Sequence, residues 1–429
     1  MKTVGVGMIG CGVVGCGVWR HLERNGALMS DRTGIRLEIR KIAVREAQKD
    51  RGIPQKFFTS DWREVVNDPQ VNLVLELMGG ATTAREAAEA ALRAGKPLIT
   101  ANKALLAEHG ESLCALADKQ GAPLYFEASV AGGIPIIKAL REGLCANRIR
   151  SIHGIINGTC NYILTRMAEH GESFEAALAE AKRLGYAEAD ERLDVDGWDA
   201  AHKAAILASL AYGFWIPASR AHVEGIRGVE PLDVKLARKF GYALKLLAII
   251  RADENNAVNI RVHPTLVPSQ HILASVNGAY NAIAVDGDVV GDTLFYGKGA
   301  GADATASAVL SDLIEAGINW SAQKKPSPLS GHCLDGKIVG MEKIRARYYM
   351  RLTVVDRPGV LAQVASILGL QQISISSVFQ PERHEGKAVS LVLLLHEAHE
   401  AVIQAAVRQI NQLEATQEKT RIIRIEDFS

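Results

Sequence analysis

The chain has 429 residues, 48% of them apolar and 23% charged, and its 49 lysines and arginines balance 48 aspartates and glutamates. A chain of this length exceeds one ordinary hydrophobic core, so two or three domains are expected. The formal net charge of +1 gives no electrostatic footprint for a nucleic acid. No apolar run approaches the roughly 18 residues that a membrane-spanning helix needs. We therefore expect a globular protein with no nucleic-acid partner and no membrane contact.

The N-terminus and the cysteines indicate a cytoplasmic protein. The apolar run 4–9 passes directly into glycines, without the cleavage site of a signal peptide, and so predicts a β-strand. The cysteines show no paired C-x-x-C spacing, which argues against a zinc site and a disulfide framework. They are Cys11, Cys16, Cys114, Cys145, Cys160 and Cys333.

Residues 1–130 predict a Rossmann-like, doubly wound nucleotide-binding domain in a chain of the α/β class. Strands and helices alternate along this part of the sequence, a pattern that favours right-handed crossovers and a parallel sheet. Strands are expected at 4–9, 35–44, 71–77, 97–100 and 123–127, and helices at 13–25, 82–94 and 104–120.

Residues 131–322 predict a central α+β domain. A strand is expected at 148–156, a helix from Thr159, further helices at 172–184 and 199–212, and β-rich alternation around 258–286. The helical segment 303–322 is expected to pack back on the first domain. Residues 323–347 contain prolines, serines and lysines and have the composition of a linker.

Residues 348–429 predict a third, smaller domain. The expected order is strand, helix, strand, strand, helix, strand, which is the ferredoxin-like βαββαβ arrangement. These elements are placed at 348–354, 360–368, 373–379, 388–395, 398–412 and 420–425.

A glycine-rich motif follows the first strand. Gly10-Cys11-Gly12-Val13-Val14-Gly15 fits G-x-G-x-x-G between a strand and a helix. Glycine permits the tight turn, the close approach of the backbone to a pyrophosphate and the packing of helix on strand, while the helix N-terminus attracts the anion. In this context the motif predicts a dinucleotide site and not a plain glycine-rich turn.

The end of the second strand bears on the choice between NAD and NADP. An acidic residue there holds the ribose 2′-hydroxyl of NAD and repels a 2′-phosphate. This chain has Ala43-Val44-Arg45 instead. We favour NADP because Arg45 can pair with a 2′-phosphate; the alternative is an exposed arginine without a ligand.

Carboxylates gather before one lysine in the central domain. The segment comprises Gly185, Tyr186, Glu188, Asp190, Asp194, Asp196, Asp199 and Lys203. Asp199 and Lys203 stand at i and i+4 and therefore share one face of a helix. A surface ion pair is one explanation. The other is a pocket for a substrate that carries an ammonium and a hydroxyl group.

Lys103 ends a second polar motif, Thr100-Ala101-Asn102-Lys103, which includes the end of the strand expected at 97–100. Doubly wound sheets bind their ligands at the carboxyl ends of the strands. Lys103 is therefore either an exposed lysine or part of the same active site.

Together these motifs resemble the homoserine dehydrogenase family, in the right order and over essentially the whole chain. Three further segments carry the resemblance: Glu127-Ala128-Ser129-Val130-Ala131-Gly132-Gly133-Ile134-Pro135, Asn157-Gly158-Thr159-Cys160-Asn161-Tyr162 and Gly297-Lys298-Gly299-Ala300-Gly301. The resemblance implies the NAD(P)-linked interconversion of L-homoserine and L-aspartate 4-semialdehyde, on the branch that leads to threonine, methionine and isoleucine.

The resemblance also implies roles for single residues. Lys203 matches the proposed general acid–base, and Lys103 matches a lysine that assists near the nicotinamide, while Gly301 joins the cofactor residues. The implied substrate residues are Thr159, Gly185, Tyr186, Glu188, Asp194 and Asp199. A monovalent cation, usually sodium, is implied at the main-chain carbonyls of Glu127, Val130, Gly132 and Ile134. Relatives usually have proline at the position of Glu191, so the rigidity of that loop is in question.

The segment Asp356-Arg357-Pro358-Gly359-Val360-Leu361 gives residues 348–429 a resemblance to ACT domains, which commonly bind amino acids at paired interfaces. Pro358 and Gly359 make a turn before a helix whose exposed amides can hold a carboxylate. The resemblance implies an effector site at Asp356, Gly359, Val360 and Leu361, with L-threonine as feedback inhibitor. The alternative is a structural dimerisation domain with an empty site.

Two rival functions stay open at this point. One is a related reductase for a different amino-acid aldehyde, and the other is a non-catalytic sensor of nucleotide and amino acid. A sensor has no need of both Lys103 and Lys203 beside a carboxylate cluster, which favours the enzyme. Relatives dimerise through the central domain and small βαββαβ units associate through their sheets, so a homodimer or homotetramer is expected.

Overall fold

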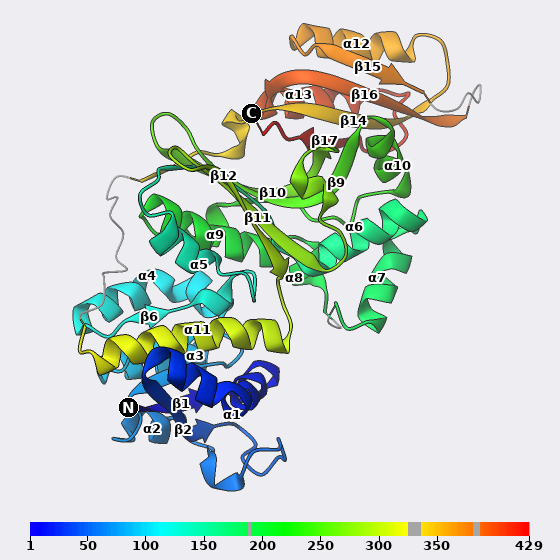
Figure 1. Cartoon of the computed structure of the whole chain (residues 1–429). Coiled ribbons are helices and arrows are strands. Elements are labelled where there is room, and N and C mark those ends of the chain that lie inside the picture. Colours follow the sequence, from blue (N-terminus) through cyan, green and yellow to red (C-terminus); the bar gives the residue numbers. More distant parts are fainter. Residues whose placement is uncertain (188–189, 325–335, 381–386, 429) are drawn as a thin grey trace.

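The computed structural model describes residues 1–187, 190–324, 336–380 and 387–428. Figure 1 shows three parts stacked along the molecule, with the N-terminal part at one end, the C-terminal part at the other and a large sheet between them. Within the described residues, no helix is both long and apolar enough to cross a membrane.

The N-terminal part is built on a six-stranded parallel sheet with the order β3-β2-β1-β4-β5-β6. The chain starts at the middle of this sheet and turns outward in both directions, so a crevice opens between the carboxyl ends of β1 and β4, where such sheets bind ligands. This confirms the predicted Rossmann-like domain. The strands are β1 (Lys2–Ile9), β2 (Ile35–Ala43), β3 (Phe58–Thr59), β4 (Leu73–Glu76), β5 (Leu98–Thr100) and β6 (Leu124–Tyr125).

A helix from far along the sequence completes this domain. α11 (Ala302–Ser321) lies beside α1 (Val13–Thr33), and the two approach so closely that a Cβ on Gly17 would stand 3.1 Å from the carbonyl oxygen of Ala302. Apolar side chains of α11 join the core of the parallel sheet. The remaining helices of this part are α2 (Trp62–Asn67), α3 (Thr82–Arg93) and α4 (Lys103–Gln120).

The central part is an antiparallel sheet with the order β12-β11-β7-β9-β10. Its strands are β7 (Ile149–Ile155), β9 (Tyr242–Ala252), β10 (Ala257–Pro268), β11 (Tyr280–Gly287) and β12 (Gly291–Lys298), and the short strands β8 (His222–Val223) and β13 (Lys337–Ile338) pair with β10. The sequence pattern did not predict β9. This strand is buried from Leu244 to Ile250, on both faces, so it lacks the polar alternation that distinguishes a strand from a buried helix.

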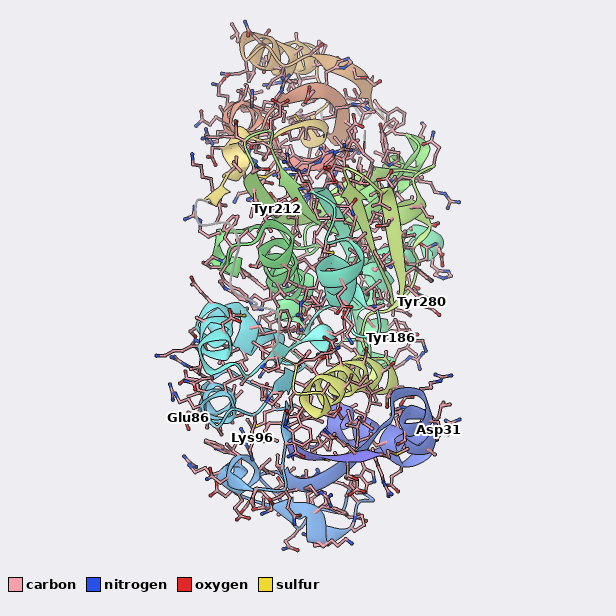
Figure 2. All side chains as sticks on the ribbon, turned by 60° about the vertical axis from the view of Figure 1, so that its left-hand side comes forward. Asp31, Glu86, Lys96, Tyr186, Tyr212 and Tyr280 are labelled. Carbon is pink, nitrogen blue, oxygen red and sulfur yellow. The ribbon has the colours of Figure 1, made fainter. Side chains whose placement is uncertain are left out.

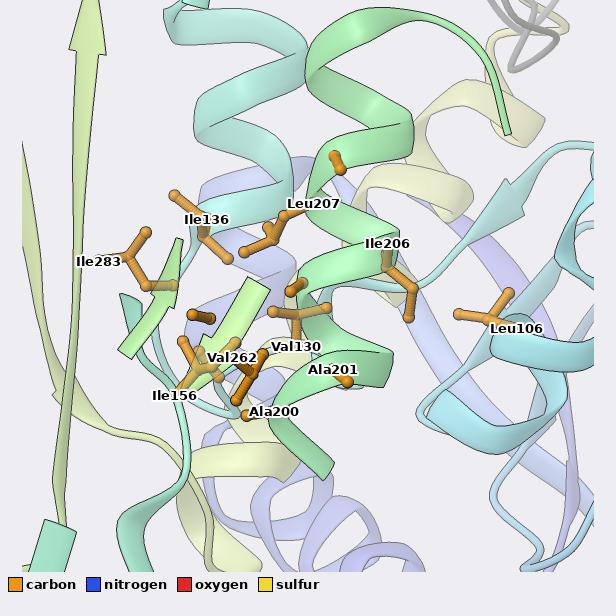
Figure 3. Close-up of a cluster of buried hydrophobic side chains, with 14 of the residues drawn as sticks. Leu106, Val130, Ile136, Ile156, Ala200, Ala201, Ile206, Leu207, Val262 and Ile283 are labelled. Carbon is orange, nitrogen blue, oxygen red and sulfur yellow. The ribbon is translucent and has the colours of Figure 1, made fainter. Parts of the chain in front are cut away.

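Helices pack against one face of the central sheet and meet in a dense core. They are α6 (Gly158–His170), α7 (Phe174–Arg183), α8 (Arg192–Val195), α9 (Trp198–Tyr212) and α10 (Pro231–Lys239). Figure 3 shows the part of this core where Ala200, Ala201, Ile206 and Leu207 of α9 meet Val130, Ile136, Ile156, Val262 and Ile283. Because α9 is buried along most of its length, the polar side chains in its first turns are held rigidly.

The C-terminal part has the predicted βαββαβ order. It consists of β14 (Arg345–Val355), α12 (Val360–Leu370), β15 (Ile375–Phe379), β16 (Ala388–His399), α13 (Glu400–Ile410) and β17 (Arg421–Ile425), with the sheet order β17-β14-β16-β15. One feature was not expected from the sequence. β17 also pairs in parallel with β10, so the central and C-terminal sheets form one continuous sheet of eleven strands.

Buried ion pairs reinforce this junction. The Arg424 guanidinium donates to Glu224 at 2.8 Å and to Glu400 at 2.6 Å, and Arg261 donates to Glu426 at 3.0 Å. All of these except Glu224 are almost fully buried. Removal of one partner from such a pair leaves an uncompensated charge and typically costs about 3–5 kcal/mol. The C-terminal domain is therefore an integral part of the fold.

Candidate active site

The three glycines of the N-terminal motif satisfy three different requirements. Gly10 has φ +95°, and a Cβ there would stand 2.5 Å from the carbonyl oxygen of Leu77. A Cβ on Gly15 would stand 2.8 Å from the carbonyl oxygen of Gly10, so Gly15 serves the packing of α1 on β1. A Cβ on Gly12 would meet nothing within 4 Å. The absent side chain at Gly12 thus leaves open space at the N-terminus of α1, as an incoming pyrophosphate requires.

A cavity of about 630 Å³ lies beside this turn and reaches the end of β2. Gly10, Cys11, Gly12 and Arg45 line it, and Val13 and Val14 follow at the start of α1. Lys49 and Arg51 also line it, and Arg51 Nε donates to the Cys11 carbonyl at 3.1 Å. The sequence pattern did not indicate these two cations, because they follow β2 in a loop without periodicity. The cavity and its cations fit a phosphorylated dinucleotide.

Two lysines from different domains meet on one buried carboxylate. Lys203 Nζ donates to Asp199 Oδ2 at 2.8 Å and to the Ile156 carbonyl at 2.8 Å. Lys103, the first residue of α4, donates to the other oxygen of the same carboxylate, Asp199 Oδ1. The Asp199 side chain is only 3% exposed. The pair Asp199 and Lys203 is thus buried inside the molecule and is not a surface ion pair.

The pKa values of Asp199 and Lys203 depend on each other. Burial raises the pKa of the Asp199 carboxyl, but the ammonium groups of Lys203 and Lys103 outweigh it and hold that pKa well below its ordinary value. Burial lowers the pKa of Lys203, and the attraction of Asp199 opposes that change. Asp199 therefore stays ionised, while burial makes the ammonium of Lys203 easier to deprotonate than that of an exposed lysine.

Asn157 connects this group to the substrate residues that the sequence indicated. Its Nδ2 donates to Asp199 Oδ2 and to Asp194 Oδ1, each at 2.8 Å, and its Oδ1 caps α6 by accepting from the Cys160 amide at 2.8 Å. Thr159 Oγ1 donates to the Tyr186 carbonyl at 2.5 Å and lies 3.3 Å from Asp194 Oδ2. The sequence pattern included Asn157 in a motif but did not predict a role for it. Its preference for the N-cap position was the available signal.

Gly185 and Tyr186 lie beside this group, because the Tyr186 carbonyl accepts from Thr159. Gly185 has φ +76° and follows α7, and the Tyr186 ring packs against Tyr162 with 4.9 Å between ring centroids. Figure 2 shows Tyr186 at the level where the central part meets the N-terminal part. Glu188 lies outside the described residues. Glu191, where relatives usually have proline, forms ion pairs with Lys182 at 2.6 Å and Arg227 at 3.2 Å.

The segment indicated as a cation site is a tight backbone turn between the two domains. It begins with the short helix Glu127–Ser129, and Ala131 and Gly132 follow with φ +54° and +51°. A Cβ on Gly132 would stand 2.6 Å from the carbonyl oxygen of Gly299, in the loop that leads through Gly301 into α11. In the described part of the chain, no three His, Cys, Asp or Glu side chains form a metal cluster. A cation bound in this turn would therefore rely on carbonyl ligands.

A doubly wound sheet with a glycine-rich turn, whose ligand edge meets a buried lysine–carboxylate pair through Lys103, is the arrangement of a nicotinamide-dependent oxidoreductase. Residues 10–127 match the family model "Homoserine dehydrogenase, NAD binding domain", residues 135–314 match "Homoserine dehydrogenase", and residues 348–415 match "ACT domain". The chain belongs to the homoserine dehydrogenase family, whose members are oxidoreductases that act on a CH–OH group with NAD(P).

Relatives and solved structures match the whole chain. A homoserine dehydrogenase from Pseudomonas aeruginosa is 43% identical over 100% of both chains, and one from Helicobacter pylori is 40% identical over 99% of this chain and 100% of its own length. The crystal structure of a homoserine dehydrogenase from Thiobacillus denitrificans, 43% identical, superposes with a TM-score of 0.94 over 100% of this chain and 99% of that chain.

Proposed function

We propose that the chain interconverts L-homoserine and L-aspartate 4-semialdehyde where Lys103, Asp199 and Lys203 meet. The observation that carries this proposal is the shared Asp199 carboxylate, which joins a lysine at the ligand edge of the dinucleotide sheet to a buried lysine of the central domain. A protein that only sensed metabolites would gain nothing from burying a lysine with a depressed pKa in this place.

Lys203 is the proposed acid–base. In homoserine oxidation the proton of the substrate hydroxyl passes to the neutral Lys203 Nζ, and in the reverse direction the ammonium gives that proton to the aldehyde oxygen. When bound, the nicotinamide takes up or supplies the hydride. The contacts with Asp199 and the Ile156 carbonyl fix the position of Nζ, and Lys103 adds positive charge that favours a developing alkoxide.

Asp194 is the proposed partner of the substrate ammonium. No lysine or arginine in the described part of the chain lies within salt-bridge distance of its carboxylate, whereas both oxygens of Asp199 are already bound by lysines. Burial raises the pKa of Asp194 and the charge of Asp199 adds to that rise, while the Asn157 hydrogen bond and the two lysine charges oppose it. A cationic substrate group would oppose the rise further. Thr159, Gly185, Tyr186 and Glu188 are the other proposed substrate residues.

We assign the cavity beside the glycine-rich motif to NAD(P), with a preference for NADP. Arg45, Lys49 and Arg51 gather at the end of β2, where the 2′-phosphate of such a cofactor lies. A solved archaeal relative, 28% identical over 73% of this chain with a TM-score of 0.63, is described in complex with NADPH. A monovalent cation, most simply sodium, is proposed at the carbonyls of Glu127, Val130, Gly132 and Ile134.

We propose L-threonine as an effector of the C-terminal domain, at Asp356, Gly359, Val360 and Leu361. Gly359 has φ +92° and precedes α12 without a side-chain cap. The Val360 amide donates to the Arg357 carbonyl at 3.4 Å, so the amides that follow it in the first turn are the ones proposed to hold a ligand carboxylate. Inhibition should be reversible and should not compete directly with homoserine. A cytoplasmic homodimer or homotetramer is also proposed, and a purely structural C-terminal domain is the alternative.

A steady-state assay tests the function. The absorbance of the reduced nicotinamide is followed with L-homoserine and each cofactor in turn, with and without millimolar L-threonine. Homoserine-dependent reduction of NADP or NAD is the expected result. Binding of cofactor without any turnover would indicate a sensor, and turnover with another amino-acid alcohol alone would indicate a related reductase.

A further inference from the structure

Glu76 is a fully buried acidic residue that the proposed mechanism does not use. It is the last residue of β4, at the carboxyl edge of the parallel sheet, and its exposed fraction is 0%. Burial raises the pKa of its carboxyl, and hydrogen bonds from Thr100, Met78 and Asn102 oppose that rise. A buried carboxyl costs free energy unless its hydrogen bonds compensate, so a group kept here calls for a reason beyond packing.

One oxygen of Glu76 holds the turn beside the cofactor cavity. Glu76 Oε1 accepts from the Met78 amide at 2.8 Å. Leu77, Met78 and Gly79 line the cavity next to the glycine-rich motif, and the Leu77 carbonyl is the group against which Gly10 packs.

The other oxygen leads to Lys103. Glu76 Oε2 accepts from Thr100 Oγ1 at 2.6 Å, and Thr100 Oγ1 in turn accepts from the Asn102 amide at 3.0 Å. Asn102 is the N-cap of α4: its Oδ1 accepts from the Leu105 amide at 3.1 Å, while its Nδ2 donates to the Gly80 carbonyl at 2.7 Å. Lys103 is the next residue, so this network determines where α4 begins and from which direction the Lys103 side chain reaches Asp199.

We propose that Glu76 is a positioning residue that fixes the cofactor turn through Met78 and the Lys103 ammonium through Thr100 and Asn102. This inference rests on the proposed role of Lys103. It adds that a single carboxyl at the edge of the sheet sets two parts of the active site at once. Displacement of a reacting group by about 1 Å can cost on the order of 100-fold in rate, so a change at Glu76 should be felt in turnover.

A double-mutant cycle with Lys103 tests the proposal. Glu76→Gln keeps the size of the side chain but replaces one acceptor oxygen by an NH₂ group, which cannot accept from the Met78 N–H or the Thr100 O–H. We expect kcat/KM for homoserine at saturating NADP to fall about 10-fold or more in Glu76→Gln, and clearly less when the same change is made in Lys103→Ala, where only the effect through the cofactor turn is left. If the two losses multiply, Glu76 does not act through Lys103 and the proposal is overturned.

Two other measurements separate this role from general stability. The affinity for NADPH, followed by protein fluorescence because Trp62 lines the cavity, should weaken about 3-fold or more in Glu76→Gln. Thr100→Ser keeps the linking hydroxyl and should be near wild type, whereas Thr100→Val should lose as much turnover as Glu76→Gln. Equal activity of the two Thr100 variants would contradict the proposal, even if Glu76→Gln does not fold.

Glu86→Gln is the matched control, because Glu86 lies exposed on α3 at the outer surface of the same domain (Figure 2). It should leave turnover and NADPH affinity unchanged. A wild-type protein without homoserine turnover would refute the proposed function, while the NADPH affinities would still decide whether Glu76 orders the cofactor turn. An active wild type with an unimpaired Glu76→Gln variant would refute this inference alone.

Discussion

Lys103 and Asp199 are separated by 96 positions in the sequence, belong to two different domains and form an ion pair in the candidate active site. The Asp199 side chain is 3% exposed, whereas that of Lys103 is 39% exposed and faces the ligand edge of the dinucleotide sheet. The site is therefore complete only while the N-terminal and central domains are packed together. A shift between the domains would separate the two lysines and change the charge balance around Asp199.

Replacement of Lys203 by alanine should lower kcat for homoserine oxidation by about two to four orders of magnitude, the usual contribution of a positioned acid–base. Cofactor affinity should be retained, because Lys203 is not among the residues that line the glycine-rich cavity. Lys103→Ala should also lose most activity. Lys119→Ala, an exposed change on the same helix as Lys103, is the control. Near wild-type turnover of Lys203→Ala in a steady-state assay would remove Lys203 from the mechanism.

Asp199→Asn should shift the pH profile of homoserine oxidation. The pKa of Asp199 lies below its ordinary range, so this residue stays ionised and does not itself titrate near neutral pH. Its charge favours the protonated form of Lys203, so neutralising it lowers the pKa of that lysine further. The rising limb of log kcat against pH should move to lower pH by about one unit or more. Asp190→Asn, an exposed change shortly before α8, is the control. An unchanged limb in Asp199→Asn would mean that another group titrates.

Gly12→Ala should mainly weaken cofactor binding, whereas Gly10→Ala should mainly lower the stability of the fold. A Cβ on Gly12 meets open space, so Gly12→Ala should keep the melting temperature within about 1 °C while weakening NADP binding about 10-fold or more. Gly10→Ala places a Cβ 2.5 Å from a carbonyl oxygen at φ +95° and should lower the melting temperature by several degrees, about 1–3 kcal/mol of strain. Thermal unfolding and a fluorescence titration check both outcomes. Full NADP affinity in Gly12→Ala would place the pyrophosphate elsewhere.

Arg45→Ala should reduce the preference for NADP over NAD. Loss of a charge-assisted contact with a 2′-phosphate is expected to lower kcat/KM about 10-fold with NADP and little with NAD. Lys49 and Arg51 line the same cavity, so the double change Arg45→Ala and Lys49→Ala should lower the ratio further. Arg24→Ala, an exposed arginine of α1, is the control for net charge. An unchanged ratio of the two cofactors, or a wild type that prefers NAD, would refute the assignment.

Glu224→Gln should weaken inhibition by threonine. Glu224 accepts from Arg424 of β17, and two residues later the Ile226 amide donates to the Val195 carbonyl at 2.8 Å, beside Asp194. These contacts form a covalent and hydrogen-bonded route from the C-terminal domain to the substrate pocket. Allosteric coupling is typically about 1–3 kcal/mol, so the inhibition constant should rise about 5-fold or more at unchanged basal turnover. Glu254→Gln, an exposed change in the turn between β9 and β10, is the control.

The point variant is preferred to deletion of the C-terminal domain. Deletion would remove the ion-pair partners of Arg261 and Glu224 that the C-terminal segment supplies, and it would remove the pairing of β17 with β10. Threonine inhibition that is the same in wild type and Glu224→Gln would show that the signal takes another route. A wild type indifferent to threonine would leave the domain with a structural role or a different effector.

The sequence alone determined the properties that depend on local pattern. Strand and helix alternation, the G-x-G-x-x-G motif and the βαββαβ order depend on periodicity and on the backbone freedom of glycine, both of which are visible within short windows. The likeness of several motifs in one order indicated the family, because independent segments rarely agree by chance. The same local signals placed Asp199 and Lys203 on one helix face.

Only the tertiary structure determined which residues from distant segments are in contact. It brought Lys103 into contact with Asp199, and it placed Asn157 where its amide binds the carboxylates of Asp194 and Asp199. It also connected Glu76 to the start of α4. It also buried β9 on both faces and joined β17 to β10. Contacts between distant segments leave no periodic trace in the sequence, because they arise from the packing of whole domains. The charge state of a buried lysine is likewise set by desolvation and by neighbours that only the folded chain brings together.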